Sequence, residues 1–173
     1  MTRRVVVAPD SFKGTASAAD AAAALGRGWA SVAGGDDLVL RPMADGGEGT
    51  IDAFEAAVPG ALRVPVTVHG PDGRPVATSW LLLPDGTAVI ELAMTSGITL
   101  LDPLRPLDAH TLGFGQAIAA ALDAGASRLL LALGGSSSTD GGVGALAALG
   151  GRFTDATGRP VRLGNRGIRS FVN

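Results

Sequence analysis

The residues best suited to chemistry fall in three short segments that are rich in glycine, acids and hydroxyls: residues 9–15, 44–50 and 134–142. Each segment follows a predicted strand and precedes a predicted helix. In an open parallel sheet such loops lie at the carboxyl ends of the strands, where ligands bind. Glycine lets backbone N–H groups approach an anion closely, and the following helix adds a favourable dipole. The three loops therefore predict a site for a phosphate or another small anion.

The charged side chains of these loops suit phosphate chemistry. Asp10, Asp45, Glu48 and Asp140 could hold Mg²⁺ or accept a proton from an attacking hydroxyl. Lys13 is the only lysine among 14 basic residues, and its compact ammonium group suits the neutralisation of a phosphate. Simpler roles remain open: the acids could serve only as helix caps, and Lys13 could be an ordinary solvated side chain.

Composition limits the class of protein. A chain of 173 residues with 46% hydrophobic and 17% charged residues suits one folded domain and excludes a disordered chain. A net charge of −2 argues against nucleic-acid binding. The absence of cysteine excludes disulfides, thiol nucleophiles and cysteine-based zinc sites. The apolar run 5–8 is too short for a signal peptide or a membrane span, which predicts a soluble cytoplasmic protein without membrane contacts.

Local patterns predict the elements that position these loops. Apolar runs predict strands at 5–8, 37–40 and 128–133, and the first of them reads as fully buried. Helices are predicted at 17–32, 50–58, 111–124 and 143–149, with Ser17 as the N-cap of the first. Two Pro-Asp-Gly turns separate β-rich stretches at 62–69, 76–83 and 87–92, which indicates an antiparallel meander.

These elements predict an α/β fold with a parallel-sheet core, glycine-rich β-to-α loops and an antiparallel β-hairpin insertion at about 60–110. One unit would span residues 1–161, with a small hairpin at 152–161, followed by an irregular tail at 162–173. The Walker phosphate-binding pattern is absent. The spacing Gly142-x-Gly144-x-x-Ala147 loosely matches a dinucleotide fingerprint, so a dinucleotide-binding module is a third, weakly supported hypothesis.

Taken together, the segments VVVAPDSFKGT, PMADGGEGT and LGGSSSTDGGVG resemble the signature segments of bacterial type 1 glycerate kinases. The stretch 88–93 with 96–98 is also similar to that family, and the match spans about residues 4–160. The resemblance implies ATP-dependent phosphorylation of D-glycerate with Mg²⁺ in the cytoplasm. It also implies a two-domain α/β protein with a cleft between the domains.

By this similarity, Lys13, Asp45 and Asp140 are the expected catalytic residues, with Asp140 favoured as the base. Asp45, Glu48 and Asp140 are the expected Mg²⁺ ligands. The expected phosphate- or substrate-binding residues are Asp10, Ser11, Gly46, Gly47, Glu48, Gly134, Gly135, Ser136, Ser137 and Thr139. Ser137 stands where the family pattern suggests alanine.

Length is the main departure from the family, whose members are about twice as long and use their carboxyl half to complete the fold and the cleft. The resemblance is expected to stop near Val161, so the sequence reads as an amino-terminal portion. The leading hypothesis is a glycerate kinase. The alternative is a non-catalytic remnant that binds anions or needs a partner to fold, and that self-associates through apolar surface left uncovered.

Overall fold

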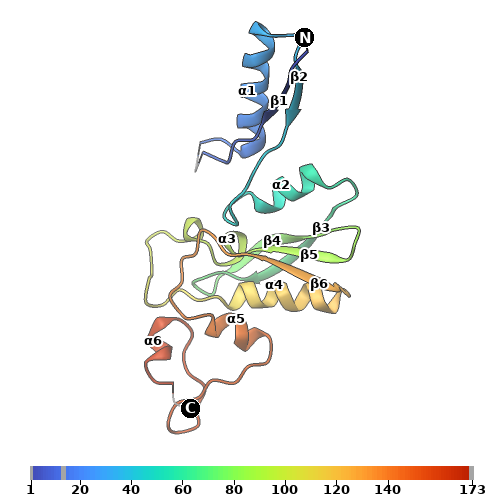
Figure 1. Cartoon of the computed structure of the whole chain (residues 1–173). Helices are drawn as coiled ribbons and strands as arrows, with labels where there is room; N and C mark the ends of the chain where they lie inside the picture. The colour runs from blue at the N-terminus through green and yellow to red at the C-terminus, as the bar shows by residue number, and fades with distance from the viewer. Residues whose placement is uncertain (1, 13–14, 172–173) are drawn as a thin grey trace.

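The computed structural model describes residues 2–12 and 15–171 (Figure 1). The strands are β1 Arg4–Val7, β2 Asp37–Leu40, β3 Leu62–His69, β4 Pro75–Leu82, β5 Thr87–Glu91 and β6 Arg128–Ala132. The helices are α1 Ala18–Val32, α2 Thr50–Ala57, α3 Leu92–Ser96, the 3-10 helix η1 Ile98–Leu100, α4 Leu112–Asp123, α5 Val143–Ala148 and α6 Asn165–Ile168. The strands divide into two separate sheets.

The amino-terminal unit is a β-α-β arrangement that stands apart from the larger sheet in Figure 1. β1 and β2 pair in parallel, from Arg4 opposite Asp37 to Val7 opposite Leu40. The N-cap prediction for α1 is confirmed, because the Ser17 hydroxyl accepts a hydrogen bond from the Asp20 N–H at 3.1 Å. Gly26 brings the helix close to the strands, since a methyl group there would lie 3.0 Å from Leu40 Cδ2.

The prediction that the first strand is fully buried is wrong for this structure. Val6 in the middle of β1 is 59% exposed, and Leu40 at the end of β2 is also exposed. The reason is that this sheet has two strands and a single helix in the described part of the chain, so one face is left without cover.

The larger sheet has the strand order β3-β4-β5-β6. β3, β4 and β5 are antiparallel neighbours, as the meander predicts, and β5 pairs in parallel with β6 from Thr87 opposite Arg128 onward. The mixed α/β class with parallel pairs is therefore confirmed. The antiparallel strands β3 and β4 extend the same sheet, because β5 pairs with both β4 and β6.

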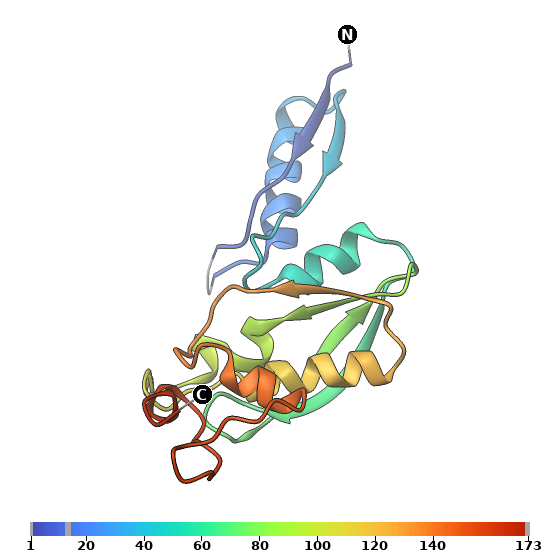
Figure 2. The same cartoon turned by 60° about the horizontal axis from the view of Figure 1, so that its bottom comes forward.

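Alternating side chains bury both faces of this sheet. On one face, Trp80 and Ile90 pack with Phe114 of α4, and α5 lies beyond α4 (Figure 2). On the other face, Leu81 and Val89 pack against Ile51 of α2. The period of two along β4 and β5 thus fixes α2 and α4 on opposite sides, which positions the loops at the strand ends.

The last part of the chain is more ordered than predicted. The small hairpin predicted at 152–161 is present as a chain reversal at residues 155–158, with an isolated bridge between Thr154 and Pro160 and a hydrogen bond from the Val161 N–H to the Phe153 carbonyl at 3.0 Å. The segment after it forms α6 instead of an irregular tail. Gly164 packs against the Asp108 backbone, and Arg166 donates to an Asp108 carboxylate oxygen at 3.0 Å. These contacts explain why the local sequence, which lacks a helical period, still adopts a helical turn.

Candidate active site

A pocket of about 510 Å³ brings parts of all three predicted loops together. Its lining residues are Asp10, Ser11, Asp45, Gly47, Glu48, Ile98, Thr99, Leu133, Gly134 and Gly135. The first loop follows β1, the second follows β2 and the third follows β6, so each contributes from the carboxyl end of a strand. Carboxylates and exposed glycine backbone therefore meet in one hollow, as a site for phosphates requires.

Close backbone contact between the second and third loops shapes the pocket. A methyl group on Gly134 would lie 2.3 Å from Gly47 Cα, so only glycine fits at this approach. Asp45 Oδ1 accepts the Gly47 N–H at 2.9 Å and stabilises the turn, in which Gly46 has a φ of +95°. Glu48 extends toward the third loop, because its Oε1 would lie 3.5 Å from a methyl group on Gly135.

The first loop is tied to the same region. The Met43 N–H donates to the Pro9 carbonyl at 3.0 Å, which continues the β1–β2 pairing into both loops. The Asp10 carboxylate accepts the Ser11 N–H at 2.6 Å, so both predicted residues stand at the pocket wall. Lys13, the predicted phosphate ligand, lies outside the described residues.

The hydroxyl-rich part of the third loop turns away from the pocket. Ser137 donates from both its N–H (3.1 Å) and its hydroxyl (2.9 Å) to the Ser96 carbonyl at the end of α3. The Thr139 hydroxyl donates to the Pro106 carbonyl at 2.7 Å. Ser136 pairs with Gly97 in an isolated bridge. These three predicted ligands do not line the pocket; they fasten the loop to α3 and to the segment before α4.

Asp140 is a buried structural acceptor in this geometry. Its side chain is only 1% exposed. Oδ2 accepts the Thr111 N–H and hydroxyl, both at 2.8 Å, and the Gly144 N–H at 3.2 Å, while Oδ1 accepts the Gly142 N–H at 3.1 Å. These donors belong to the starts of α4 and α5. The alternative role as a helix cap therefore explains the contacts of Asp140 better than a role as catalytic base.

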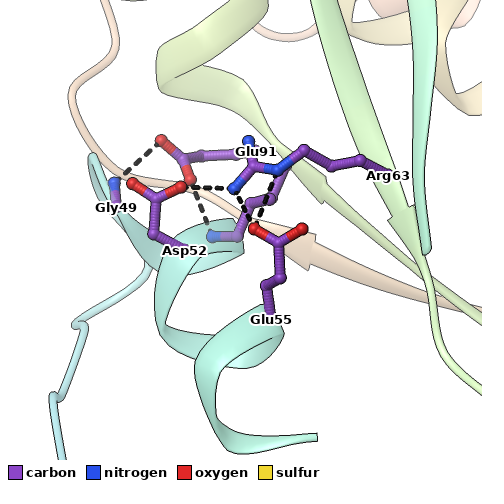
Figure 3. A network of polar contacts seen from close by, with 6 residues as sticks. Gly49, Asp52, Glu55, Arg63 and Glu91 are labelled. Atoms are coloured by element: carbon purple, nitrogen blue, oxygen red, sulfur yellow. Dashed lines mark hydrogen bonds and ion pairs between the residues drawn. The ribbon is translucent and has the colours of Figure 1, made fainter. Parts of the chain in front are cut away.

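The start of α2 is capped by a residue that sequence reasoning does not assign to the site. Glu91, at the end of β5, is 1% exposed and accepts the N–H groups of Gly49 and Ile51 at 3.2 and 3.0 Å (Figure 3). Burial raises the pKa of Glu91, and the two N–H groups partly oppose that shift. The N–H groups at the start of α2 therefore do not need Asp45 or Glu48 as cap residues. The sequence does contain a signal for this role, because Glu91 is the only charged residue in the strand β5.

A second, exposed cluster lies on the outer side of α2. The Arg63 guanidinium on β3 donates to the carboxylates of both Asp52 and Glu55, the latter at 2.7 Å (Figure 3). These two carboxylates raise the pKa of Arg63. Arg63 offsets part of the negative charge of Asp52 and Glu55 next to Glu91, and the described lining of the pocket carries the carboxylates of Asp10, Asp45 and Glu48.

The expected three-carboxylate Mg²⁺ site is not formed in the described part of the chain. No group of three or more His, Asp or Glu side chains there could hold a metal ion. Asp140 faces the α4–α5 junction, whereas Asp45 and Glu48 line the pocket. One of these two carboxylates is enough for an ion that is shared with phosphate oxygens, because Mg²⁺ usually takes one or two carboxylates together with substrate phosphates.

The described residues contain no helix with the length and apolar character that a membrane crossing needs. Glycine-rich loops that meet acidic side chains at strand ends define an α/β protein with a candidate ligand site at the carboxyl ends of its strands. The chain belongs to the glycerate kinase family, whose family model matches residues 5–172.

Known proteins similar to this chain carry the same assignment. The chain is 46% identical over 173 residues to a glycerate kinase of Bacillus subtilis (strain 168) and 39% identical over 171 residues to a glycerate 2-kinase of Escherichia coli (strain K12). A solved structure assigned as glycerate kinase 2 from Salmonella typhimurium LT2 superposes with a TM-score of 0.82 at 36% identity, covering 99% of this chain and 47% of that one.

The extent of the match corrects one expectation. The family pattern continues to residue 172 instead of stopping near Val161, so the segment that contains α6 belongs to it. The chain spans 45% of the length of each of the two bacterial relatives, with 98% and 97% of its own residues aligned. The expectation of a portion of a longer family fold is confirmed.

Proposed function

We propose that this chain carries the phosphate- and substrate-binding loops of a glycerate kinase, which transfers the terminal phosphoryl group of ATP to a hydroxyl of D-glycerate. The observation that carries the proposal is the single pocket lined by Asp10, Asp45, Glu48 and the Gly134–Gly135 backbone. The family match makes these the loops of a kinase. The proposal implies a cytoplasmic location, because ATP is supplied there.

Phosphoryl transfer mainly requires positioning and charge neutralisation. Backbone N–H groups near Gly134 would contact phosphate oxygens, and the Lys13 ammonium would supply positive charge. Glu48, which reaches toward Gly135, would hold Mg²⁺ together with the phosphates. The bound ion would neutralise phosphate charge. Asp45 replaces Asp140 as the proposed proton acceptor, because it lines the pocket whereas Asp140 is already engaged by backbone donors.

A neighbouring hollow gives room for the rest of a nucleotide or for the acceptor. It measures about 550 Å³, shares Ser11 and Glu48 with the first pocket, and reaches the start of α1 at Ser17. The two hollows form adjoining compartments on either side of Glu48. This arrangement suits two ligands that meet near one carboxylate.

A coupled assay that follows ADP release from MgATP and D-glycerate tests the proposal. Purified chain is expected to turn over, and Lys13→Ala is expected to lower kcat/KM by about 100-fold or more, as for loss of one transition-state donor. Lys13→Arg is the control that retains charge and changes its shape. Turnover that is unchanged in Lys13→Ala would contradict the role of Lys13.

A second candidate is a chain that binds anions but acts only after association. The apolar flank of α1 favours it, because Leu25, Trp29 and Val32 are exposed side by side along a hollow of about 1020 Å³. Binding of MgATP without turnover would support this candidate. Turnover by the monomer would reject it.

A further inference from the structure

The helix that follows the second loop has no cap of its own. Gly49 is the N-cap residue of α2, has a φ of +88° and offers no side chain to the first N–H groups of the helix. Such groups need an acceptor when they are buried. The acceptor is Glu91, which lies 40 residues further along the chain than Ile51, on β5.

This contact ties the pocket loop to the sheet. The Glu91 carboxylate holds Gly49 on one side of the turn and Ile51 on the other. Glu48 immediately precedes Gly49, and it lines the pocket together with Gly47. A shift at Gly49 would therefore be passed directly to the two residues that face the ligand.

A simple cap would not need this arrangement. A serine or asparagine at the N-cap position satisfies a helix terminus without burying a charge. Glu91 instead brings a carboxylate to a place where it is 1% exposed, and burial is the largest influence on its pKa. The negative charge of Asp52 raises the pKa further, while the Arg63 guanidinium pairs with Asp52 and Glu55 at the surface. The ionised carboxylate therefore carries a desolvation cost that its hydrogen bonds to the Gly49 and Ile51 N–H groups partly offset.

We propose that Glu91 is a positioning residue, which binds the Gly49 and Ile51 amides so that Glu48 and Asp45 face the pocket and the α2 terminus is closed to the ligand. The phosphates would then meet the Gly134–Gly135 loop instead of the start of α2. The inference rests on the proposed function only for the identity of the ligand. The loop geometry stands on its own.

Amide hydrogen exchange of the intact chain, followed by NMR, tests the geometry. In the wild type, the Gly49 and Ile51 amides are expected to exchange slowly at neutral pH. Glu91→Gln keeps the size of the side chain but turns one acceptor into a donor, so exchange at both amides is expected to rise at least tenfold. The matched control is Glu55→Gln, an exposed carboxylate on the same helix that does not touch the loop. Unchanged exchange in Glu91→Gln would overturn the proposal.

Calorimetric titration with MgATP tests the consequence for the site. Glu91→Gln is expected to weaken binding at least fivefold when it is measured well below the thermal midpoint of the variant, where the variant is folded. A cap with only a structural role would lower the midpoint but leave the affinity of the folded variant unchanged, and that result would also overturn the proposal. If the wild type binds no MgATP, the proposed function fails for this chain, and the exchange of the two amides still decides the role of Glu91.

The wild type alone provides a further measurement if Glu91→Gln does not fold. The amide shifts of Gly49 and Ile51 should follow the titration of the Glu91 carboxyl, measured on its own side-chain carbon. Amide shifts that stay constant through that titration would contradict the contact.

Discussion

At the scale of single residues, the two deeply buried carboxylates both bind backbone N–H groups of distant segments. Asp140 joins the starts of α4 and α5 through Thr111, Gly142 and Gly144. Glu91 joins α2 to β5. Asp140 caps α5 locally, from two residues before Gly142, and α4 from 29 residues away, while Glu91 caps α2 from 40 residues away, so each carboxylate fixes how two elements lie relative to one another.

The role of Asp140 predicts a large loss of stability on substitution. Asp140→Asn leaves a donor amide facing backbone donors in a buried site, and it should lower the free energy of unfolding by about 3 kcal/mol. Urea denaturation measures this change. Asp123→Asn, at an exposed position at the end of α4, is the control and should change stability by less than about 0.5 kcal/mol. A similarly small change in the free energy of unfolding for Asp140→Asn would contradict its structural role, and Asp140 would again be a candidate catalytic acid.

His110 predicts the pH dependence of stability. It is 6% exposed, its Nδ1 has no partner in the described part of the chain, and burial lowers its pKa despite the nearby Asp140 carboxylate. A histidine whose pKa falls on folding contributes stability that is present above its ordinary value near 6.5 and is lost as the pH falls below it.

The contribution of His110 to the free energy of unfolding should therefore decrease between pH 7 and pH 5, opposite in sign to that of Glu91 with its raised pKa, and His110→Gln should remove this contribution from the slope. Urea titrations at several pH values provide the measurement. The exposed His69, which bonds to Gln116, supplies the control variant His69→Asn. A slope that is the same in His110→Gln and the wild type would show that other groups set the acid sensitivity.

At the scale of elements, the second and third loops depend on the contact between Gly47 and Gly134. Gly134→Ala should push the loops apart, because the added methyl group would lie 2.3 Å from Gly47 Cα. We expect a loss of at least about 2 kcal/mol in stability and a weaker affinity for MgATP. Gly28→Ala is the matched control, because nothing lies within 4 Å of that methyl group and the residue lies within α1.

The control variant Gly28→Ala should raise the free energy of unfolding by about 0.5–1 kcal/mol, since alanine is a better helix former than glycine. Chemical denaturation and calorimetry of the two variants compare them directly. Equal stability of Gly134→Ala and the wild type would mean that the loops can separate without consequence for the fold.

At the scale of the whole molecule, the α1 flank is an apolar surface without cover in the described part of the chain. Val32 is 90% exposed and Leu25 is 54% exposed. Asp20 and Arg27 border the same hollow seven residues apart, so two antiparallel copies of α1 would place each aspartate near an arginine of the other. The flank is therefore complementary to itself in charge as well as apolar.

Self-association through this flank is the expected outcome at high protein concentration. Leu25→Lys should lower the association constant at least tenfold, as followed by sedimentation velocity over a concentration series. Leu122→Lys changes another exposed leucine, on α4 outside the flank, and should leave association unchanged. If the wild type remains monomeric at all concentrations, self-association through the flank is contradicted, and the flank would be a surface for a different partner.

The sequence by itself determined the local elements. Ser17 before an alanine-rich helix and the two Pro-Asp-Gly turns of the meander act within a few residues, and the structure confirms each. The same local motifs were specific enough to identify the family, because three of them occur in order. Residues 62–92 show that turn chemistry and a period of two suffice to predict strand pairing between neighbours.

Only the tertiary structure decided which of the predicted residues share a site. Glu91 and Ile51 are 40 residues apart and Asp140 and Thr111 are 29 apart, and no periodicity along the chain encodes such pairings. They arise because packing on the two faces of the sheet brings strand ends and helix starts together. The acids of the loops look alike in sequence, but burial and the backbone donors available at each position separate Asp45 and Glu48, which face the pocket, from Asp140, which does not.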